Sequence, residues 1–195
     1  MSGTLALIGG SNFGDDDGHH RQLFDPGATV GLLPTAMAYE NPTGAIERAR
    51  GHFATMDNPI EVIPAMNRSD AAEGDVLSAA RSADSIYVTG GSPMHLRSVL
   101  KDTPLLDALI ERWSAGATVA VAAESCSVLC GHMVDNRGGA FTVGLGLVTT
   151  LTVIPRFDQW SPDKRTRTTK LAPPELLVVG IDEATALVRS PDGTW

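Results

Sequence analysis

Short apolar runs alternate along the chain with longer segments in which apolar residues recur every three or four positions. A run of four to six apolar and β-branched residues, bounded by Gly, Pro or polar residues, predicts a buried strand. Seven stretches have this character: 4–8, 29–33, 60–63, 85–89, 118–123, 151–154 and 176–181. Most of them are separated by enough residues for one helix.

Two of the intervening segments carry clear helix signals. In 41–56, Asn41 is suited to cap the helix and Pro42 to occupy its first position. The apolar residues recur at helical spacing: Ala45, Ile46, Ala49 and Phe53. In 103–116, Thr103 and Pro104 open a helix and Gly116 ends it. Its stripe comprises Leu105, Leu106, Leu109, Ile110 and Trp113.

Buried strands joined by amphipathic crossover helices are typical of an α/β fold. We therefore predict a doubly wound, mostly parallel sheet with helices on both faces. The chain has 195 residues, of which 43% are hydrophobic, enough for a substantial core. It contains no internal repeat and no long linker, so residues 1–195 are expected to form a single domain.

The net charge limits the kinds of binding partner, and the cysteine content indicates the state of the thiols. The formal net charge is −8, and no basic cluster offers an attractive field for nucleic acid or anionic lipid. No run approaches the length of a membrane span, and residues 1–10 lack the features of a secretory leader. These features predict a cytoplasmic protein with no nucleic-acid or membrane partner. Cys126 and Cys130 are expected to be reduced structural thiols.

The longest polar stretch, 9–26, follows the first predicted strand, and five side chains able to bind a metal lie close together in it. They are Asp15, Asp16, Asp17, His19 and His20. Adjacent carboxylates converge on one ion only with an unusual backbone, and Gly14 and Gly18 bracket them as in a solvated loop. We therefore predict neither a metal nor another cofactor.

The stretch 119–131, V-A-V-A-A-E-S-C-S-V-L-C-G, is the most informative for chemistry. A buried strand runs into Ser125, and a helix is predicted to follow at once, as in a nucleophile elbow. Residues two positions from the nucleophile must be small there, and Ala123 and Ser127 meet that condition. The Cys126 amide is placed to donate to an oxyanion. The alternative is an ordinary strand-to-helix turn capped by Ser125.

A second turn, Thr89-Gly90-Gly91-Ser92-Pro93, lies between a predicted strand and a helix that contains Leu96, Val99 and Leu100. Its glycines permit close approach of the backbone to a ligand. By itself such a turn does not identify a ligand-binding site, because many strand-to-helix turns require glycine.

Several segments together resemble the serine peptidases that include dipeptidase E and cyanophycinase, which have the class I glutamine amidotransferase-like (flavodoxin-like) fold. The similarity extends over about residues 5–188. The segments that carry it are Gly9-Gly10-Ser11, Leu32-Leu33-Pro34-Thr35-Ala36, 83–91 with Leu96, Leu100, Thr103 and Leu105, the elbow, Gly144-Leu145-Gly146-Leu147, and Gly180-Ile181-Asp182-Glu183 with Thr185, Ala186 and Leu187.

The resemblance implies roles for individual residues. The elbow of these peptidases usually reads S-A-G-A, which identifies Ser125 as the nucleophile and makes Cys126-Ser127-Val128 a departure from the pattern. Their T-G-G turn supplies oxyanion backbone, which corresponds to Gly90 and Gly91. Their acidic residue corresponds to Glu183.

The general base of these peptidases is a histidine in a segment resembling P-H-[FY]-D, which here reads Pro155-Arg156-Phe157-Asp158. Arg156 therefore stands at the histidine position. A guanidinium with a pKa above about 12 cannot accept a serine proton at neutral pH. On this interpretation Arg156 should reach toward Ser125 and pair with Glu183 or Asp158.

Three other side chains are candidates for the base or the nucleophile. His95 follows the Gly90-Gly91 turn and is a candidate base, or else a surface cap. His132 lies about two turns down the predicted helix, roughly 10 Å away, and is too distant for direct proton transfer. Cys126 is the alternative nucleophile because the same fold hosts cysteine amidotransferases, but its register next to Ser125 turns it away from the crevice.

The sequence is consistent with two functions. One is a serine hydrolase with impaired catalysis that acts on short or aspartyl peptides, using Ser125, Glu183 and the amides of Gly90, Gly91 and Cys126. The other is a pseudoenzyme that keeps the crevice as a binding or assembly surface. An unpaired Arg156 would suit an acidic small ligand or a protein partner, and a homodimer is also kept open.

Overall fold

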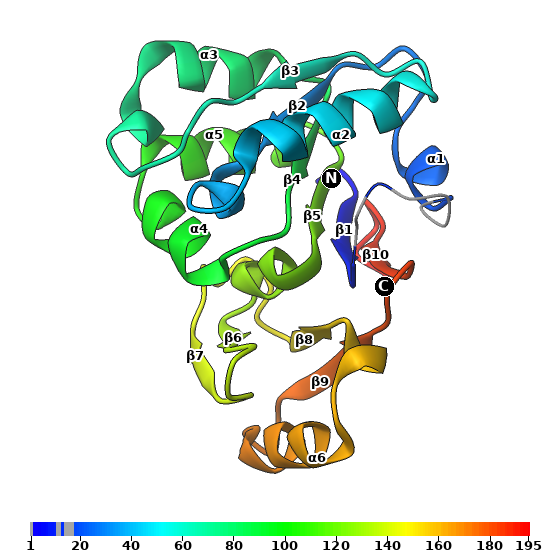
Figure 1. The fold of residues 1–195 in the computed structure, drawn as a ribbon, viewed down its shortest axis with the longest axis vertical. Helices are drawn as coiled ribbons and strands as arrows, with labels where there is room; N and C mark the ends of the chain where they lie inside the picture. The colour runs from blue at the N-terminus through cyan, green and yellow to red at the C-terminus, as the bar shows by residue number, and fades with distance from the viewer. Residues whose placement is uncertain (1, 11–12, 14–17) are drawn as a thin grey trace.

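The computed structural model describes residues 2–10, 13 and 18–195, and its centre is a six-stranded sheet (Figure 1). The strands are β1 (Leu5–Ile8), β2 (Val30–Leu33), β3 (Ile60–Val62), β4 (Ser85–Val88), β5 (Val119–Ala122) and β10 (Ala186–Arg189). Their order is β10-β1-β5-β4-β2-β3, and all neighbours are parallel except β10, which is antiparallel to β1. The predicted α/β fold with a mostly parallel sheet is confirmed.

Several helices begin at a proline or at a capping side chain. They are α1 (His20–Leu23), α2 (Pro42–Ala54), α3 (Gly74–Ser82), α4 (Pro93–Leu100), α5 (Pro104–Ser114) and α6 (Pro162–Leu171). Four of the six have Pro at the first position, where a missing N–H costs nothing. The Asn41 side chain accepts a hydrogen bond from the Gly44 N–H at 2.9 Å, as predicted for the cap of α2. None of the helices in the described part of the chain is long and apolar enough to cross a membrane.

Alternate residues of each strand point to opposite faces, and both faces are covered. Leu5 and Leu7 of β1 pack in the larger core with residues of α3, α4 and α5. Ala6 and Ile8 pack in the second core with α2 and with Phe24, which follows α1. A sheet buried on both sides accounts for the continuous apolar runs in the sequence.

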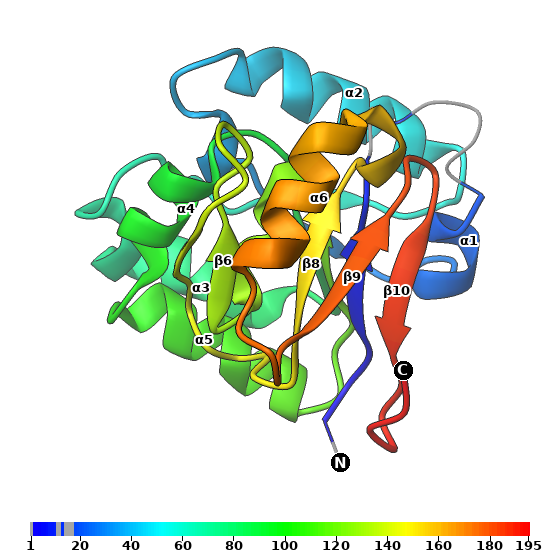
Figure 2. The ribbon, with the colours of Figure 1, turned by 90° about the horizontal axis from the view of Figure 1, so that it is seen from below.

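The chain also forms two small sheets that the hydrophobic pattern did not predict. β8 (Leu151–Pro155) pairs in parallel with β9 (Leu177–Ile181) rather than joining the main sheet, and β6 (His132–Val134) pairs with β7 (Phe141–Val143). These strands and α6 lie together at the lower end of the molecule in Figure 1, and Figure 2 shows α6 beside β8 and β9. Apolar runs identify strands, but which strands pair with one another depends on segments that are distant in the sequence.

The segment after β5 also differs from the prediction. It forms a 3₁₀ helix, η3 (Ala123–Leu129), which ends before Cys130. The chain then enters β6, so His132 is an exposed strand residue and not a helical one. Three further 3₁₀ segments are η1 (Thr35–Met37), η2 (Asp70–Ala72) and η4 (Phe157–Gln159).

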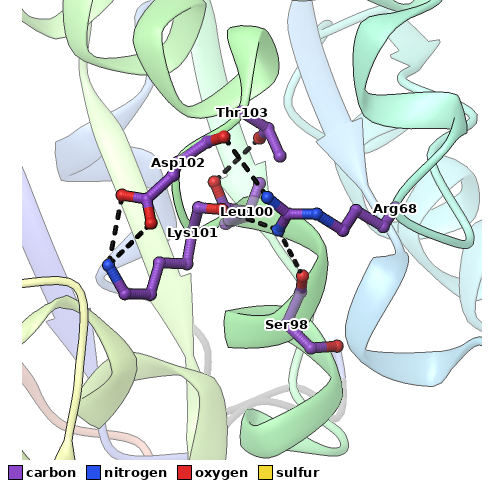
Figure 3. Close-up of polar contacts among 6 residues, drawn as sticks. All are labelled: Arg68, Ser98, Leu100, Lys101, Asp102 and Thr103. Atoms are coloured by element: carbon purple, nitrogen blue, oxygen red, sulfur yellow. Dashed lines mark hydrogen bonds and ion pairs between the residues drawn. The ribbon is translucent and has the colours of Figure 1, made fainter.

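Arg68 caps the C-terminal end of α4. Its guanidinium donates to the carbonyl oxygens of Ser98 at 2.9 Å, Lys101 at 2.7 Å and Asp102 at 3.3 Å (Figure 3). The last carbonyls of a helix lack intrahelical donors, and a cation satisfies them. Asp102 itself adopts a left-handed conformation with φ 56°. This cap holds the end of the helix that follows the Gly90-Gly91 turn.

A cluster of aromatic rings packs under α2 and encloses a histidine. His20 is fully buried, its ring is stacked on Phe53, and its Nδ1 lies 2.8 Å from Nε2 of His52. Burial, with smaller contributions from His19 and His52, lowers the pKa of His20 from 6.5 to about 3. His20 is therefore neutral in the folded protein at neutral pH.

This shift predicts a specific loss of stability in acid. Between pH 6.5 and pH 3 the unfolded chain binds a proton that folded His20 does not, so the free energy of unfolding falls as the pH is lowered. The contribution reaches about 2 kcal/mol at pH 5. In His20→Phe, which keeps a buried ring, thermal unfolding measured from pH 7 to pH 5 should show a shallower pH dependence. The exposed control His132→Gln should keep the wild-type slope; equal slopes in wild type and His20→Phe would contradict the assignment.

Candidate functional site

A crevice of about 520 Å³ opens at the carboxyl ends of the parallel strands. Loops at this edge of a doubly wound sheet are where ligands bind. The described residues that line it come from β4, from the segments after β1, β2, β4, β5 and β8, and from α2. They are Phe13, Met37, Glu40, Ala45, Arg48, Tyr87, Thr89, Gly90, Gly91, Ala123, Glu124 and Arg156.

The strained residue of the strand-to-helix turn is Ala123 and not Ser125. Ala123 has φ 49°, in the left-handed region that an elbow requires of its central residue. Ser125 lies inside η3, is fully buried, and its hydroxyl has no hydrogen-bond partner among the described residues. The nucleophile elbow was expected at Ser125, whereas the strained residue of the turn lies two positions earlier. Strand β5 ends at Ala122, one residue earlier than the run 118–123 suggested.

The Thr89-Gly90-Gly91 turn faces this elbow at very short range. A Cβ on Gly90 would lie 2.8 Å from the Cβ of Ala123, so a larger residue at position 90 would collide with the turn. Gly91 has φ 131°, and a Cβ there would lie 2.4 Å from the carbonyl oxygen of Ala36. Both glycines therefore lie at the crevice, as expected, but Gly90 opposes Ala123 instead of Ser125. Neither glycine N–H donates to another described residue.

Arg156 joins three segments at the edge of the crevice. It has φ 48°, and its backbone N–H donates to the carbonyl of Gly9 at 2.9 Å. Its guanidinium lies 3.3 Å from a carboxylate oxygen of Glu124 and 3.1 Å from one of Glu183. The expected pairing with Glu183 is present, whereas the side chain reaches Glu124 rather than Ser125. Arg156 is thus not the unpaired cation on which the expectation of an acidic ligand depended.

Asp158, the other predicted partner of Arg156, has a different contact. One of its carboxylate oxygens accepts a hydrogen bond from the Glu183 N–H at 3.0 Å. This bond is the main reason that the pKa of Asp158 lies below its usual range. Asp158 therefore orients the segment that presents Glu183 to Arg156.

The alternative residues lie outside the crevice. His95 donates from Nε2 to the carbonyl of Met66 at 2.8 Å, and its ring contacts Tyr39. Cys126 and Cys130 are buried free thiols, and desolvation raises the pKa of both. Cys126 does not line the crevice, whereas Glu124 does. Asp15, Asp16 and Asp17 lie outside the described residues; within the described part no group of three metal-ligating side chains is found.

Sequence reasoning missed Ala123 and Glu124. A serine has the chemistry of a nucleophile, whereas an alanine at the centre of the turn carries no chemical signal. The length of the buried run does carry a signal for the position of the turn, because the turn must begin where the apolar β-branched stretch ends.

Comparisons with known proteins identify relatives along nearly the whole chain. The family model "Peptidase family S51" matches residues 5–194. A cyanophycinase of Trichormus variabilis is 27% identical over 144 residues, covering 69% of this chain and 48% of that protein. A cyanophycinase of Synechococcus elongatus is 24% identical over 180 residues, covering 86% and 55%. The chain spans about half the length of these curated relatives.

A solved structure extends the similarity to three dimensions. The crystal structure of a peptidase from an acI-B1 actinobacterium superimposes with a TM-score of 0.83 at 28% sequence identity. The match covers 97% of this chain and 84% of that one. The α/β architecture described above is therefore shared by a protein described as a peptidase.

The ion pairs of Arg156 predict a measurable contribution to stability. Its side chain and those of Glu124 and Glu183 are 27 to 39% exposed, so the pairs are only partly screened by water. Arg156→Ala should lower the free energy of unfolding by roughly 1–2 kcal/mol in urea denaturation, and less at high salt. The matched control is Arg137→Ala, because Arg137 is 82% exposed in its pair with Asp135. A loss no greater than that of Arg137→Ala would contradict a structural role for the Arg156 pairs.

Proposed function

The chain belongs to peptidase family S51, and we propose that it is a member in which the peptidase crevice serves as a ligand-binding site without efficient hydrolysis. Family membership establishes only that the chain is hydrolase-like, and the loss of efficient hydrolysis is what we propose in addition. It rests chiefly on one observation: the residue in the left-handed conformation at the centre of the elbow is Ala123.

Backbone geometry supports a revised alignment of the elbow. When the left-handed residue is matched to the serine of S-A-G-A, the corresponding residues are Ala123-Glu124-Ser125-Cys126. Ser125 then takes the glycine position, which agrees with its burial inside η3. Ala123 offers a methyl group where the nucleophilic hydroxyl is needed, and a methyl group cannot attack a carbonyl carbon.

The base position supports the same conclusion. Arg156 stands where these peptidases have histidine, and its guanidinium is held by Glu124 and Glu183. Among the described residues that line the crevice there is no histidine. Loss of the nucleophile or the base of such a pair costs on the order of 10⁴ to 10⁶ in rate. We propose that both have been lost here.

Other parts of the peptidase site are retained, which favours binding over loss of all function. Gly90 and Gly91 line the crevice, and their N–H groups have no acceptor among the described residues. The volume of about 520 Å³ is in the range of small-molecule sites. Two relatives are named cyanophycinase, so short peptides and aspartyl peptides are the first ligand candidates.

The proposal predicts that the wild-type protein hydrolyses neither Asp-containing dipeptides nor β-aspartyl-arginine at a useful rate. The double variant Ala123→Ser with Arg156→His supplies a hydroxyl and a base, and it should show detectable hydrolysis or labelling at position 123 by an active-site-directed serine reagent. Product formation measured by amine release, and the mass of the labelled peptide, report the two outcomes.

Ser125→Ala separates this proposal from hydrolysis by the buried serine. The variant should behave like wild type in both assays, because the Ser125 hydroxyl is not exposed to the crevice. Robust wild-type turnover that disappears in Ser125→Ala would reject the proposal and restore Ser125 as nucleophile. A folded double variant with no labelling would mean that the crevice departs from the peptidase arrangement at more than these positions.

A further inference from the structure

The crevice carries charged groups that the chain does not neutralise. Three carboxylates and two guanidiniums lie at or beside it: Glu40, Glu124, Glu183, Arg48 and Arg156. Arg156 already has two anionic partners. The charges left to interact with a ligand are therefore the excess carboxylate charge of Glu124 and Glu183 beside Arg156, the carboxylate of Glu40 and the guanidinium of Arg48.

Glu124 provides the partly buried carboxylate. One of its oxygens pairs with Arg156, and the other lies 3.7 Å from the position that a Cβ on Gly90 would occupy. This second oxygen accepts no hydrogen bond from a described residue. The side chain is only 27% exposed. A carboxylate oxygen in such a place favours an ammonium group over a second anion.

Arg48 provides the cation. It projects from α2, lines the crevice, and has no hydrogen bond or ion pair with any described residue. Arg50, two positions along the same helix, instead pairs with Glu47 at 3.0 Å and does not line the crevice. An unpaired guanidinium facing a pocket is suited to bidentate contact with a carboxylate.

Apolar side chains line the same crevice as these two charges. Phe13, Met37, Ala45 and Tyr87 all contribute to its wall, and Tyr87 is fully buried. Such a surface favours methylene groups and excludes water from the contacts.

We propose that the crevice binds a small zwitterion, with its ammonium group at Glu124, its carboxylate at Arg48 and its carbon chain against the apolar wall. The inference rests on the proposed binding function and specifies its ligand chemistry. It replaces the expectation of a purely acidic ligand, because the arginine invoked for that expectation is internally paired.

Isothermal titration calorimetry with ω-amino acids of increasing length tests the proposal directly. The series glycine, β-alanine, γ-aminobutyrate and ε-aminocaproate varies the separation of the two charges. We expect one length to bind best, and affinity to fall as salt concentration rises. For that compound, the N-acetyl derivative removes the ammonium charge and the methyl ester removes the carboxylate. Each derivative should bind about tenfold more weakly, or worse.

Matched variants connect the two ends of the ligand to the two residues. Glu124→Gln should weaken binding of the amino acid by about tenfold while leaving the already weak N-acetyl derivative unaffected. Arg48→Gln should do the same for the amino acid while leaving the methyl ester unaffected. The controls are Glu73→Gln, at an exposed residue that does not line the crevice, and Arg50→Gln, on the same helix as Arg48; both should bind as wild type does. Thermal unfolding of each variant verifies that it is folded.

The outcomes separate this inference from the proposed function. Equal binding of amino acid and methyl ester, with no effect of Arg48→Gln, would replace the zwitterion site by an amine site. Preference for the N-acetyl acid would restore an anionic ligand, and absence of binding across the series would also overturn the inference. Peptide turnover by the wild type would reject the non-hydrolytic function, whereas charge-selective binding of the amino acids would still stand.

Discussion

The close contact between the Gly90 turn and the left-handed turn at Ala123 determines the shape of the whole crevice. The contact leaves no room for a side chain at position 90, and the neighbouring Gly91 is confined by the backbone of Ala36. Strands β2, β4 and β5 thus deliver their following segments to one place. A left-handed alanine costs about 1–2 kcal/mol, and the surrounding sheet imposes it. The elbow geometry is therefore a property of the packed fold and does not require a nucleophile at its centre.

Arg156 places a cation at the edge of the crevice and pairs it within the chain. Its guanidinium serves as a fixed electrostatic contact. Its partners, Glu124 and Glu183, come from the segments that follow β5 and β9, and its N–H binds the carbonyl after β1. The arginine thereby ties the main sheet to the β8–β9 pair. The same contacts neutralise the charge that a ligand would otherwise meet.

The lower part of the molecule presents Arg156 to the crevice. Strand β8 ends at Pro155, and η4 then packs Phe157 against Gly180 of β9, where a Cβ would lie 2.4 Å from the ring. Lys164 of α6 lies over the ring of Trp160, 3.6 Å from its centroid, and so holds the helix against this part of the chain. The small sheet and α6 thus position the loop that carries Arg156 rather than extending the main sheet.

Local pattern determined the strands β1 to β5, β8 and β9, the helices α2 and α5 and the glycine turn, because each depends on residues close in the sequence. The family resemblance also followed from ordered motifs. The pairing of Arg156 with Glu183 that it implied is present, and Gly90, Gly91 and Arg156 line the same crevice. The register of the elbow could not be read in this way. The sequence assigned the elbow to Ser125 because serine has the chemistry of a nucleophile. The turn instead lies at Ala123, at the end of β5 and in close contact with Gly90. The strand pairings of β6 to β10 and the pairing of Arg156 with Glu124 likewise depend on segments distant in the sequence. Only the packed chain brings those segments together, so only the tertiary structure decides them.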